Sequence, residues 1–264
     1  MTTRGFHAAN REVLRLSGPD TRDFLQGVVT NDVHGLDRGP VYAALLTPQG
    51  KYLFDFFLIA DGDAVLLDVE SSRAQALAQR LSLYRLRAKV EIGKAELSVV
   101  IGLGRMPEAA VPDPRDPELG WRLYTPDPEA ALSAMEPLDP ARWNALRIER
   151  GVPETGIELV PDDTYILEAG FERLHGVDFR KGCYVGQEVT ARMKHKAELR
   201  KGLAPVRVEG EAPPPGTEIL ADGRTAGTLY SVAGGIGLAH LRFDRAKGTM
   251  TAGSARVTRA EPEG

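Results

Sequence analysis

Residues 41–69 read VYAALLTPQGKYLFDFFLIADGDAVLLDV and contain three apolar runs separated by two turns. Apolar runs of six to eight residues that end at turn residues are typical of buried strands. The connections Thr47-Pro48-Gln49-Gly50 and Asp61-Gly62-Asp63 consist largely of residue types that favour turns. The segment therefore predicts an antiparallel meander of three strands. These strands are expected at residues 41–46, 52–59 and 64–69.

The flanking segments extend this meander into an α+β fold. Apolar residues at steps of three and four predict one helix after Ser17-Gly18-Pro19-Asp20 and another after Ser71. Helices alternating with such strands cover one face of an antiparallel sheet. Further strands are predicted at residues 12–16, 88–92 and 96–101.

The chain is long enough for more than one hydrophobic core, and its proline and glycine content changes along the sequence. Residues 107–128 contain six prolines in 22 positions, which predicts a linker or a junction between subdomains. Asp139, Pro140 and Gly151 delimit a helix over residues 141–150. The last 63 residues hold 11 of the 28 glycines among short apolar runs, which indicates a small β-barrel or sandwich. The predicted domains are residues 1–106, 107–201 and 202–264.

The composition excludes several classes of protein. With 42% apolar and 27% charged residues and a net charge of −4, the chain is expected to fold and to bind polyanions only through a local patch. Its single cysteine, Cys183, allows no internal disulfide and no multi-thiolate metal site. No apolar stretch approaches the roughly 20 residues of a membrane span, so no membrane partner and a cytoplasmic location are expected.

The most informative motif is KGCYVGQE at residues 181–188. Gly182 and Gly186 allow the backbone to turn sharply, so the Cys183 thiol is expected on a bend. The cations that precede Gly182 would favour the thiolate, which a reactive or ligating cysteine requires. A lone cysteine is also often a small buried apolar residue, and neither His175 nor His195 can be assigned as its base.

Three carboxylates and one basic run are further candidates. Asp55, Glu149 and Glu168 lie in apolar surroundings, where a carboxylate either faces solvent or lines a pocket. Phe54 and Phe56 share one face of their predicted strand, which places Asp55 on the other. Residues 192–201 carry five positive charges and one negative. Because no aromatic residues interleave with them, a solvated face is favoured over nucleic-acid binding.

These motifs together resemble a known family. KGCYVGQE, with Ala191-Arg192 after it, resembles the signature of the YgfZ-type folate-binding proteins, whose mitochondrial relatives assist iron–sulfur cluster assembly. The resemblance implies antiparallel sheets with covering helices, arranged as a ring around a central hole that takes tetrahydrofolate, and a small C-terminal β-barrel. Other segments resemble this family and the related aminomethyltransferase T protein of glycine cleavage: FLQG (24–27), TNDV (30–33), LTPQGK (46–51) and LRIERGVP (146–153).

The resemblance also implies roles for individual residues. Cys183 would be the chemical centre and a transient, shared ligand of a cluster, with no tightly bound metal. The T protein carries two acidic residues where this chain has Phe54-Asp55, so this chain would lack one of the two acids that serve aminomethyl transfer. The folate-binding residues would be Asp55, Glu149, Glu168, Tyr184, Gln187 and Arg192. The other motif residues are Lys181, Gly182, Gly186 and Glu188.

Three functions follow as hypotheses. The first is a non-enzymatic or weakly catalytic tetrahydrofolate-binding protein that helps to assemble or repair [4Fe-4S] clusters. Its partners would be cluster assembly proteins and client enzymes, including radical enzymes that modify tRNA. The second is a folate-dependent aminomethyltransferase or demethylase. The third is an RNA-binding module that acts through residues 192–201.

Overall fold

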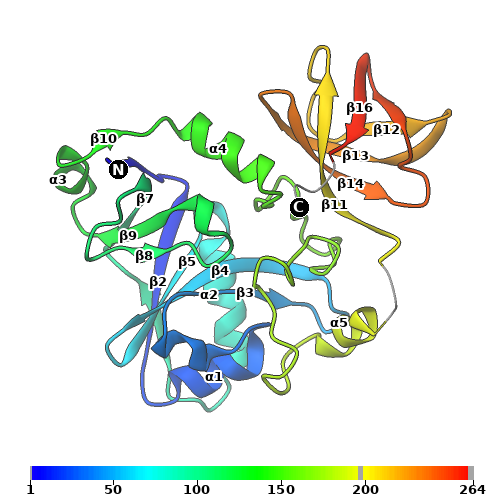
Figure 1. Cartoon of the computed structure of the whole chain (residues 1–264). Helices are drawn as coiled ribbons and strands as arrows, with labels where there is room; N and C mark the ends of the chain where they lie inside the picture. The colour runs from blue at the N-terminus through cyan, green and yellow to red at the C-terminus, as the bar shows by residue number, and fades with distance from the viewer. Residues whose placement is uncertain (1, 196–198, 261–264) are drawn as a thin grey trace.

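The computed structural model describes residues 2–195 and 199–260. Over these residues it contains two five-stranded sheets and a closed six-stranded barrel (Figure 1). This architecture confirms the predicted α+β class and the small C-terminal barrel. The helices are α1 (Thr21–Val28), α2 (Ser71–Arg85), α3 (Pro128–Ser133), α4 (Pro140–Glu149) and α5 (Gln187–Lys194), with 3-10 turns η1 (Val33–Asp37) and η2 (Pro117–Leu119).

The predicted meander forms the core of one sheet. Its strands, in spatial order, are β3 (Val41–Leu46), β4 (Tyr52–Asp61), β5 (Ala64–Glu70), β2 (Arg11–Ser17) and β6 (Glu91–Lys94). Phe54 and Phe56 pack in an apolar cluster with residues of α1 and α2. Phe57, one position along, belongs to a different cluster on the opposite face, so the predicted alternation along β4 is confirmed.

The other sheet contains a segment that was expected to be a linker. Its strands, in spatial order, are β10 (Glu136–Pro137), β1 (Thr3–His7), β7 (Ser98–Gly104), β9 (Trp121–Thr125) and β8 (Val111–Pro112). The linker that was predicted over residues 107–128 is therefore wrong, whereas the alternative of a subdomain junction stays a prediction. Two of the prolines lie where no backbone N–H is needed for a sheet hydrogen bond, because Pro112 is on the edge strand and Pro117 begins η2. Trp121 of the same window is buried. The proposed division at residue 106 stays a prediction, although strands from both sides of it share this sheet.

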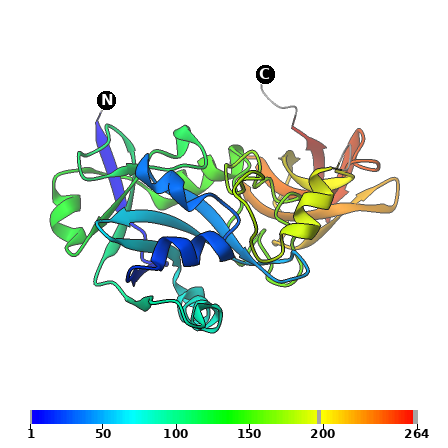
Figure 2. The same ribbon diagram turned by 90° about the horizontal axis from the view of Figure 1, so that it is seen from below.

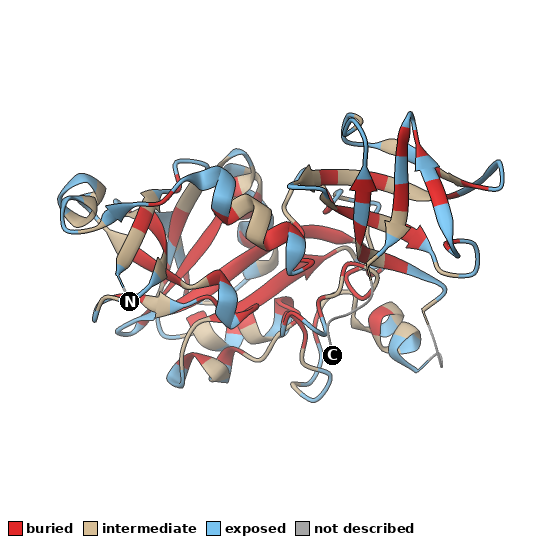
Figure 3. Ribbon diagram, turned by 45° about the horizontal axis from the view of Figure 1, so that its top comes forward, coloured by how far each residue is buried: buried red, intermediate tan, exposed pale blue. Residues whose placement is uncertain are grey.

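The two sheets pack against each other through one large apolar cluster. This cluster joins Phe57 and Ile59 of β4 to Val99 and Ile101 of β7. Buried residues fill most of β3, β4 and β5, whereas along the barrel strand β11 they alternate with less buried ones (Figure 3). α4 leads from the sheets to the barrel and contacts β13 and β14 there (Figure 1).

The barrel stands at one end of the molecule and the sheets at the other (Figure 2). Short strands with buried alternate residues close the barrel on itself, which leaves no free sheet edge. In the described ranges, none of the helices is long and apolar enough to span a membrane. The barrel strands, in spatial order, are β11 (Lys201–Glu209), β14 (Ile236–Arg242), β13 (Arg224–Ala233), β12 (Thr217–Ala221), β15 (Thr249–Ala252) and β16 (Ala255–Arg259).

Candidate functional site

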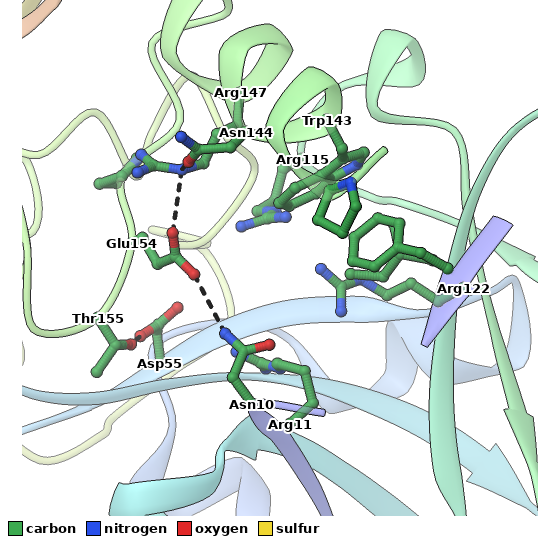
Figure 4. Close-up of a pocket in the computed structure, with 14 residues that line it drawn as sticks. Asn10, Arg11, Asp55, Arg115, Arg122, Trp143, Asn144, Arg147, Glu154 and Thr155 are labelled. Atoms are coloured by element: carbon green, nitrogen blue, oxygen red, sulfur yellow. Dashed lines mark hydrogen bonds and ion pairs between the residues drawn. The ribbon is translucent and has the colours of Figure 1, made fainter. Parts of the chain in front are cut away.

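A central cavity of about 290 Å³ lies where the two sheets meet α4 and the segment that follows it (Figure 4). One part of its wall is apolar and includes Phe6 and Trp143, whereas the rest is polar. The volume of this cavity and its partly apolar, partly polar lining are typical of a small-molecule binding site. The lining residues are Phe6, Asn10, Arg11, Asp55, Ile101, Arg115, Arg122, Pro140, Trp143, Asn144, Arg147, Pro153, Glu154 and Thr155.

Three arginines in this wall, of which Arg115 and Arg122 are buried and Arg11 is largely so, are paired with buried aspartates. Arg11 and Arg122 bind Asp68 at 2.6 and 2.9 Å, and Arg115 binds Asp113 at 2.8 Å. Burial opposes the charge of Arg11, but the adjacent Asp68 outweighs it and raises the pKa of that guanidinium. Asp113 raises the pKa of Arg115 against burial in the same way. Asp68 and Asp113 balance two of the three positive charges, and the nearby Asp55 carboxylate acts on Arg11 and Arg115 as well.

Asp55 faces the cavity from β4 and is held by hydroxyl groups. Its Oδ1 accepts hydrogen bonds from Tyr52 at 2.7 Å and Thr155 at 2.6 Å, and its Oδ2 accepts one from Tyr42 at 3.0 Å. Burial, followed by the adjacent carboxylate, raises the pKa of both phenols well above 10, so they remain donors. A carboxylate accepts about four hydrogen bonds, which leaves one position on Oδ2 for a ligand N–H.

Cys183 lies elsewhere, on an exposed turn. Gly182 and Gly186 have φ values of 98° and 83°, so both predicted bends are confirmed. The Lys181 side chain points inward and its Nζ donates to the carbonyl of Gln26 and, at 2.9 Å, to that of Val29 at the end of α1. Burial lowers the pKa of Lys181 to about 8.

The same turn is also fixed on its other side. A Cβ atom at Gly186 would lie 2.4 Å from the Thr47 carbonyl oxygen, so the turn packs closely on the β3–β4 connection. Tyr184 packs in the cluster between the sheets, and Val185 packs against the cluster under α1 and α2. The turn therefore wraps the end of the β3–β4 hairpin and brings together three segments that resemble the family.

The structure separates the residues that were predicted to bind folate. Of the described residues that line the cavity, Asp55 is the one member of the predicted set. Glu149 is exposed, because it lies two residues after the buried Arg147 and so on the opposite side of α4. Tyr184 and Gln187 belong to the Cys183 turn, where the Gln187 side chain accepts from the Tyr184 backbone N–H at 3.1 Å.

Glu168 and the basic run lie outside the cavity as well. Glu168 Oε2 is 3.3 Å from Lys201 and 3.2 Å from His240, at the base of the barrel. Burial opposes its charge, yet the hydrogen bond from His240 and the charge of Lys201 lower the pKa of Glu168. Arg192 is exposed and pairs with Glu188 at 2.7 Å, and Lys194 pairs with Glu172. Much of the positive charge of the run is thus balanced; its residues 196–198 lie outside the described part of the chain.

Several residues that line the cavity were not predicted from the sequence. Arg115 and Arg122 fall in the proline-rich window that was expected to be a linker. Asn10 and Glu154 were not singled out, although Glu154 directly follows the family-like segment 146–153. Over the described residues, no group of three or more His, Cys, Asp or Glu side chains is placed to hold a metal ion.

Comparison with known proteins places the chain in a family. Residues 200–264 match the model of the CAF17 C-terminal β-barrel domain. The iron–sulfur cluster assembly factor IBA57 of Mus musculus is 33% identical over 93% of this chain and 79% of its own length. The IBA57 of Homo sapiens is 34% identical, also over 93% of this chain and 79% of its own length. An IBA57 homologue of Pyricularia oryzae is 33% identical over 92% of this chain and 72% of its own.

The fold is also similar to that of a solved structure, aminomethyltransferase T of the glycine cleavage system from Bartonella henselae. The TM-score is 0.82 at 15% sequence identity, over 99% of this chain and 86% of that one. The three IBA57 relatives are named mitochondrial, which contradicts the expected cytoplasmic location. The narrower resemblance to YgfZ-type proteins stays a prediction. The extent and identity of the matches show that the chain belongs to the IBA57 family of iron–sulfur cluster assembly factors.

Proposed function

We propose that this protein assists the assembly or repair of [4Fe-4S] clusters in client enzymes. The observation that carries the proposal is the similarity to IBA57 assembly factors over more than nine-tenths of the chain. The exposed Cys183 thiol, on a turn fixed from two sides, supports it. One thiolate holds a cluster only together with ligands from a partner, so the partners would be cluster assembly proteins and the client enzymes.

We also propose that the central cavity binds tetrahydrofolate. The free acceptor position of Asp55 suits an N–H of the pterin ring, and the apolar wall with Phe6 and Trp143 suits its flat face. A cavity of about 290 Å³ would take the pterin, with the remainder of the ligand directed outward. When bound, this cofactor would supply one-carbon or reducing chemistry.

The positions of the two sites favour an accessory role. Asp55 and Gly50 are five residues apart along the β3–β4 hairpin, a span of about 17 Å in extended chain. The Cys183 turn packs at the Gly50 end, since a Cβ atom at Gly186 would lie 3.2 Å from the Gly50 Cα atom. A ligand in the cavity and a cluster at the thiol would therefore occupy different places.

The proposal is tested in cells that lack their own member of this family. Expression of the wild-type chain is expected to restore the activity of a [4Fe-4S] client enzyme, and expression of Cys183→Ala is expected not to. Ser254→Ala, at an exposed position of the barrel, is the control and should behave as wild type. Equal client activity with Cys183→Ala, at equal protein levels, would remove the thiol from the mechanism.

We extend the proposal to clients that are radical enzymes modifying tRNA. In the same cells, the amount of their modified nucleoside in tRNA should follow the client activity. A folate-dependent aminomethyltransferase is the second candidate, because Asp55 lies in the cavity. That function requires the purified chain to turn over a small aminomethyl donor, and Asp55→Asn to abolish turnover while Cys183→Ala does not.

A further inference from the structure

Glu154 is a second carboxylate in the wall of the central cavity. It lies in the segment after α4, and its side chain is 30% exposed, whereas Asp55 is buried. Figure 4 shows its carboxylate reaching between Arg147 and Asn10, near Thr155 and Asp55. Two carboxylates from different parts of the chain thus border the same cavity.

The Glu154 carboxylate has unused hydrogen-bonding capacity. Its Oε2 is 3.1 Å from Arg147 Nε, and its Oε1 accepts from Asn10 Nδ2 at 3.4 Å. The second of these is longer than the 2.7–3.2 Å of ordinary N–H···O bonds, so a ligand donor would replace it at little cost. Arg147 Nε donates its hydrogen to Asn144 Oδ1 at 2.8 Å, so its contact with Glu154 is an ion pair, and at least two of about four acceptor positions on Glu154 remain for a ligand.

Arg147 does not depend on Glu154 for its charge balance. Its NH1 is 3.2 Å from Oε2 of Glu158, whose side chain is fully buried, and NH1 also donates to the Val152 carbonyl at 3.1 Å. The Glu154 backbone N–H donates to the same Glu158 carboxylate at 3.0 Å. The Glu154 side chain is therefore able to accept from a ligand while its backbone stays fixed.

The surroundings select the kind of ligand. The three guanidinium groups of Arg11, Arg115 and Arg122 face the three carboxylates of Asp68, Asp113 and Asp55, so this wall has no excess positive charge to select an anion. Thr155, the next residue after Glu154, donates to Asp55, which keeps the two carboxylates in the same part of the wall. The rings of Phe6 and Trp143, with centroids 6.2 Å apart and planes tilted by 58°, supply apolar surface. A flat ring that carries N–H groups would pack on this face and donate to both carboxylates.

We propose that Glu154 is a specificity-determining residue of the central cavity and accepts a hydrogen bond from an N–H group of the bound ring, while Asp55 accepts another. This inference rests on the proposed binding of tetrahydrofolate. It assigns the second ligand-binding carboxylate to Glu154 in place of the exposed Glu149 and the distant Glu168.

The test is calorimetric binding of 5-formyltetrahydrofolate, a stable reduced folate, to the purified full chain. Glu154→Gln keeps the size of the side chain but replaces a charged acceptor by a neutral one. The Kd is expected to rise by about tenfold or more, as for the loss of a charged hydrogen bond. Glu129→Gln, at an exposed position of α3, is the matched control and should keep the wild-type Kd.

The outcomes separate this inference from the proposal on which it rests. Wild-type binding with an unchanged Kd in Glu154→Gln overturns the role of Glu154 alone. Absence of binding by the wild-type chain overturns the folate proposal and the inference with it. If Glu154→Gln lowers the melting temperature, Glu154→Asp decides, because it keeps the charge but retracts it from the cavity. A wild-type Kd in that variant contradicts the inference, and a raised Kd supports it.

Discussion

The central cavity and the Cys183 turn are built by different means. The cavity is shaped by charged side chains that are buried in mutual pairs, such as Arg11 and Arg122 with Asp68. The turn depends mainly on its backbone: two glycines with positive φ, and the Lys181 amine bound to carbonyl oxygens at the end of α1. A change in side-chain charge should therefore damage the cavity, whereas a change in backbone freedom should damage the turn.

The largest effect is expected from removal of the charge that holds the cavity wall. Asp68→Asn leaves Arg11 beside a neutral amide and Arg122 with only its longer contact to Asp113 at 3.3 Å, which should lower the free energy of unfolding by about 3–5 kcal/mol. Urea denaturation followed by circular dichroism measures this. Asp61→Asn is the control, since Asp61 and Arg15 form an exposed pair at 3.0 Å, and it should cost less than about 1 kcal/mol. Equal losses in the two variants would show that the buried network does not stabilise the cavity.

The turn should be most sensitive at Gly186. Gly182→Ala and Gly186→Ala both place an L residue at positive φ, which costs about 1–2 kcal/mol each. The methyl group introduced by Gly186→Ala would also meet the Thr47 carbonyl oxygen, whereas nothing lies within 4 Å of a Cβ atom at Gly182. Gly186→Ala should therefore be about 1 kcal/mol more destabilising than Gly182→Ala in urea denaturation. The reverse order would mean that the turn does not pack on the β3–β4 connection.

Changes in the cavity and in the Cys183 turn should also differ in their effect on the affinity for folate. Asp55→Asn replaces the acceptor that we propose for the pterin, and should raise the Kd for 5-formyltetrahydrofolate by about tenfold. Cys183→Ala should leave that Kd within about twofold of wild type, because Cys183 is absent from the described lining of the cavity. A large effect of Cys183→Ala on folate binding would place the thiol against the ligand and end the separation of the two regions.

The sequence predicted the features that depend on local patterns. Alternation along residues 52–59 places Asp55 and Phe57 together, because strand side chains alternate whatever lies around them. The helix α4 begins as predicted, with the Asp139 carboxylate accepting from the Ala141 N–H at 2.9 Å. The two glycine bends around Cys183 follow in the same way from the conformational freedom of glycine.

What the sequence could not provide were the long-range partners. Arg115 and Arg122 resemble solvated charges in a proline-rich window until their partners Asp113 and Asp68 are known. Helical spacing does indicate that Arg147 and Glu149 face opposite sides of α4, but it cannot decide which side meets the cavity. Lys181 meets Gln26 across 155 residues of sequence, a distance at which no local pattern carries information.

The smallest effect concerns the pH dependence of the turn. The Lys181 amine has a folded-state pKa of about 8, against 10.5 for the free side chain. Below pH 8 the folded protein bears the cost of burying the charge. Between pH 8 and 10.5 the folded protein releases this proton while the unfolded chain keeps it, so the contribution of Lys181 to stability rises with pH. The neutral amine still donates to the carbonyls of Gln26 and Val29, so the turn stays in place.

Melting temperatures of the wild type and Lys181→Met, measured from about pH 7 to 10, isolate this contribution. The wild type should gain on the variant above pH 8, and the gain should be small because the amine is only half-buried. Lys181→Arg keeps its charge over the whole range, so its curve should run parallel to that of Lys181→Met. A wild-type curve parallel to both would show that the amine is not buried at the end of α1.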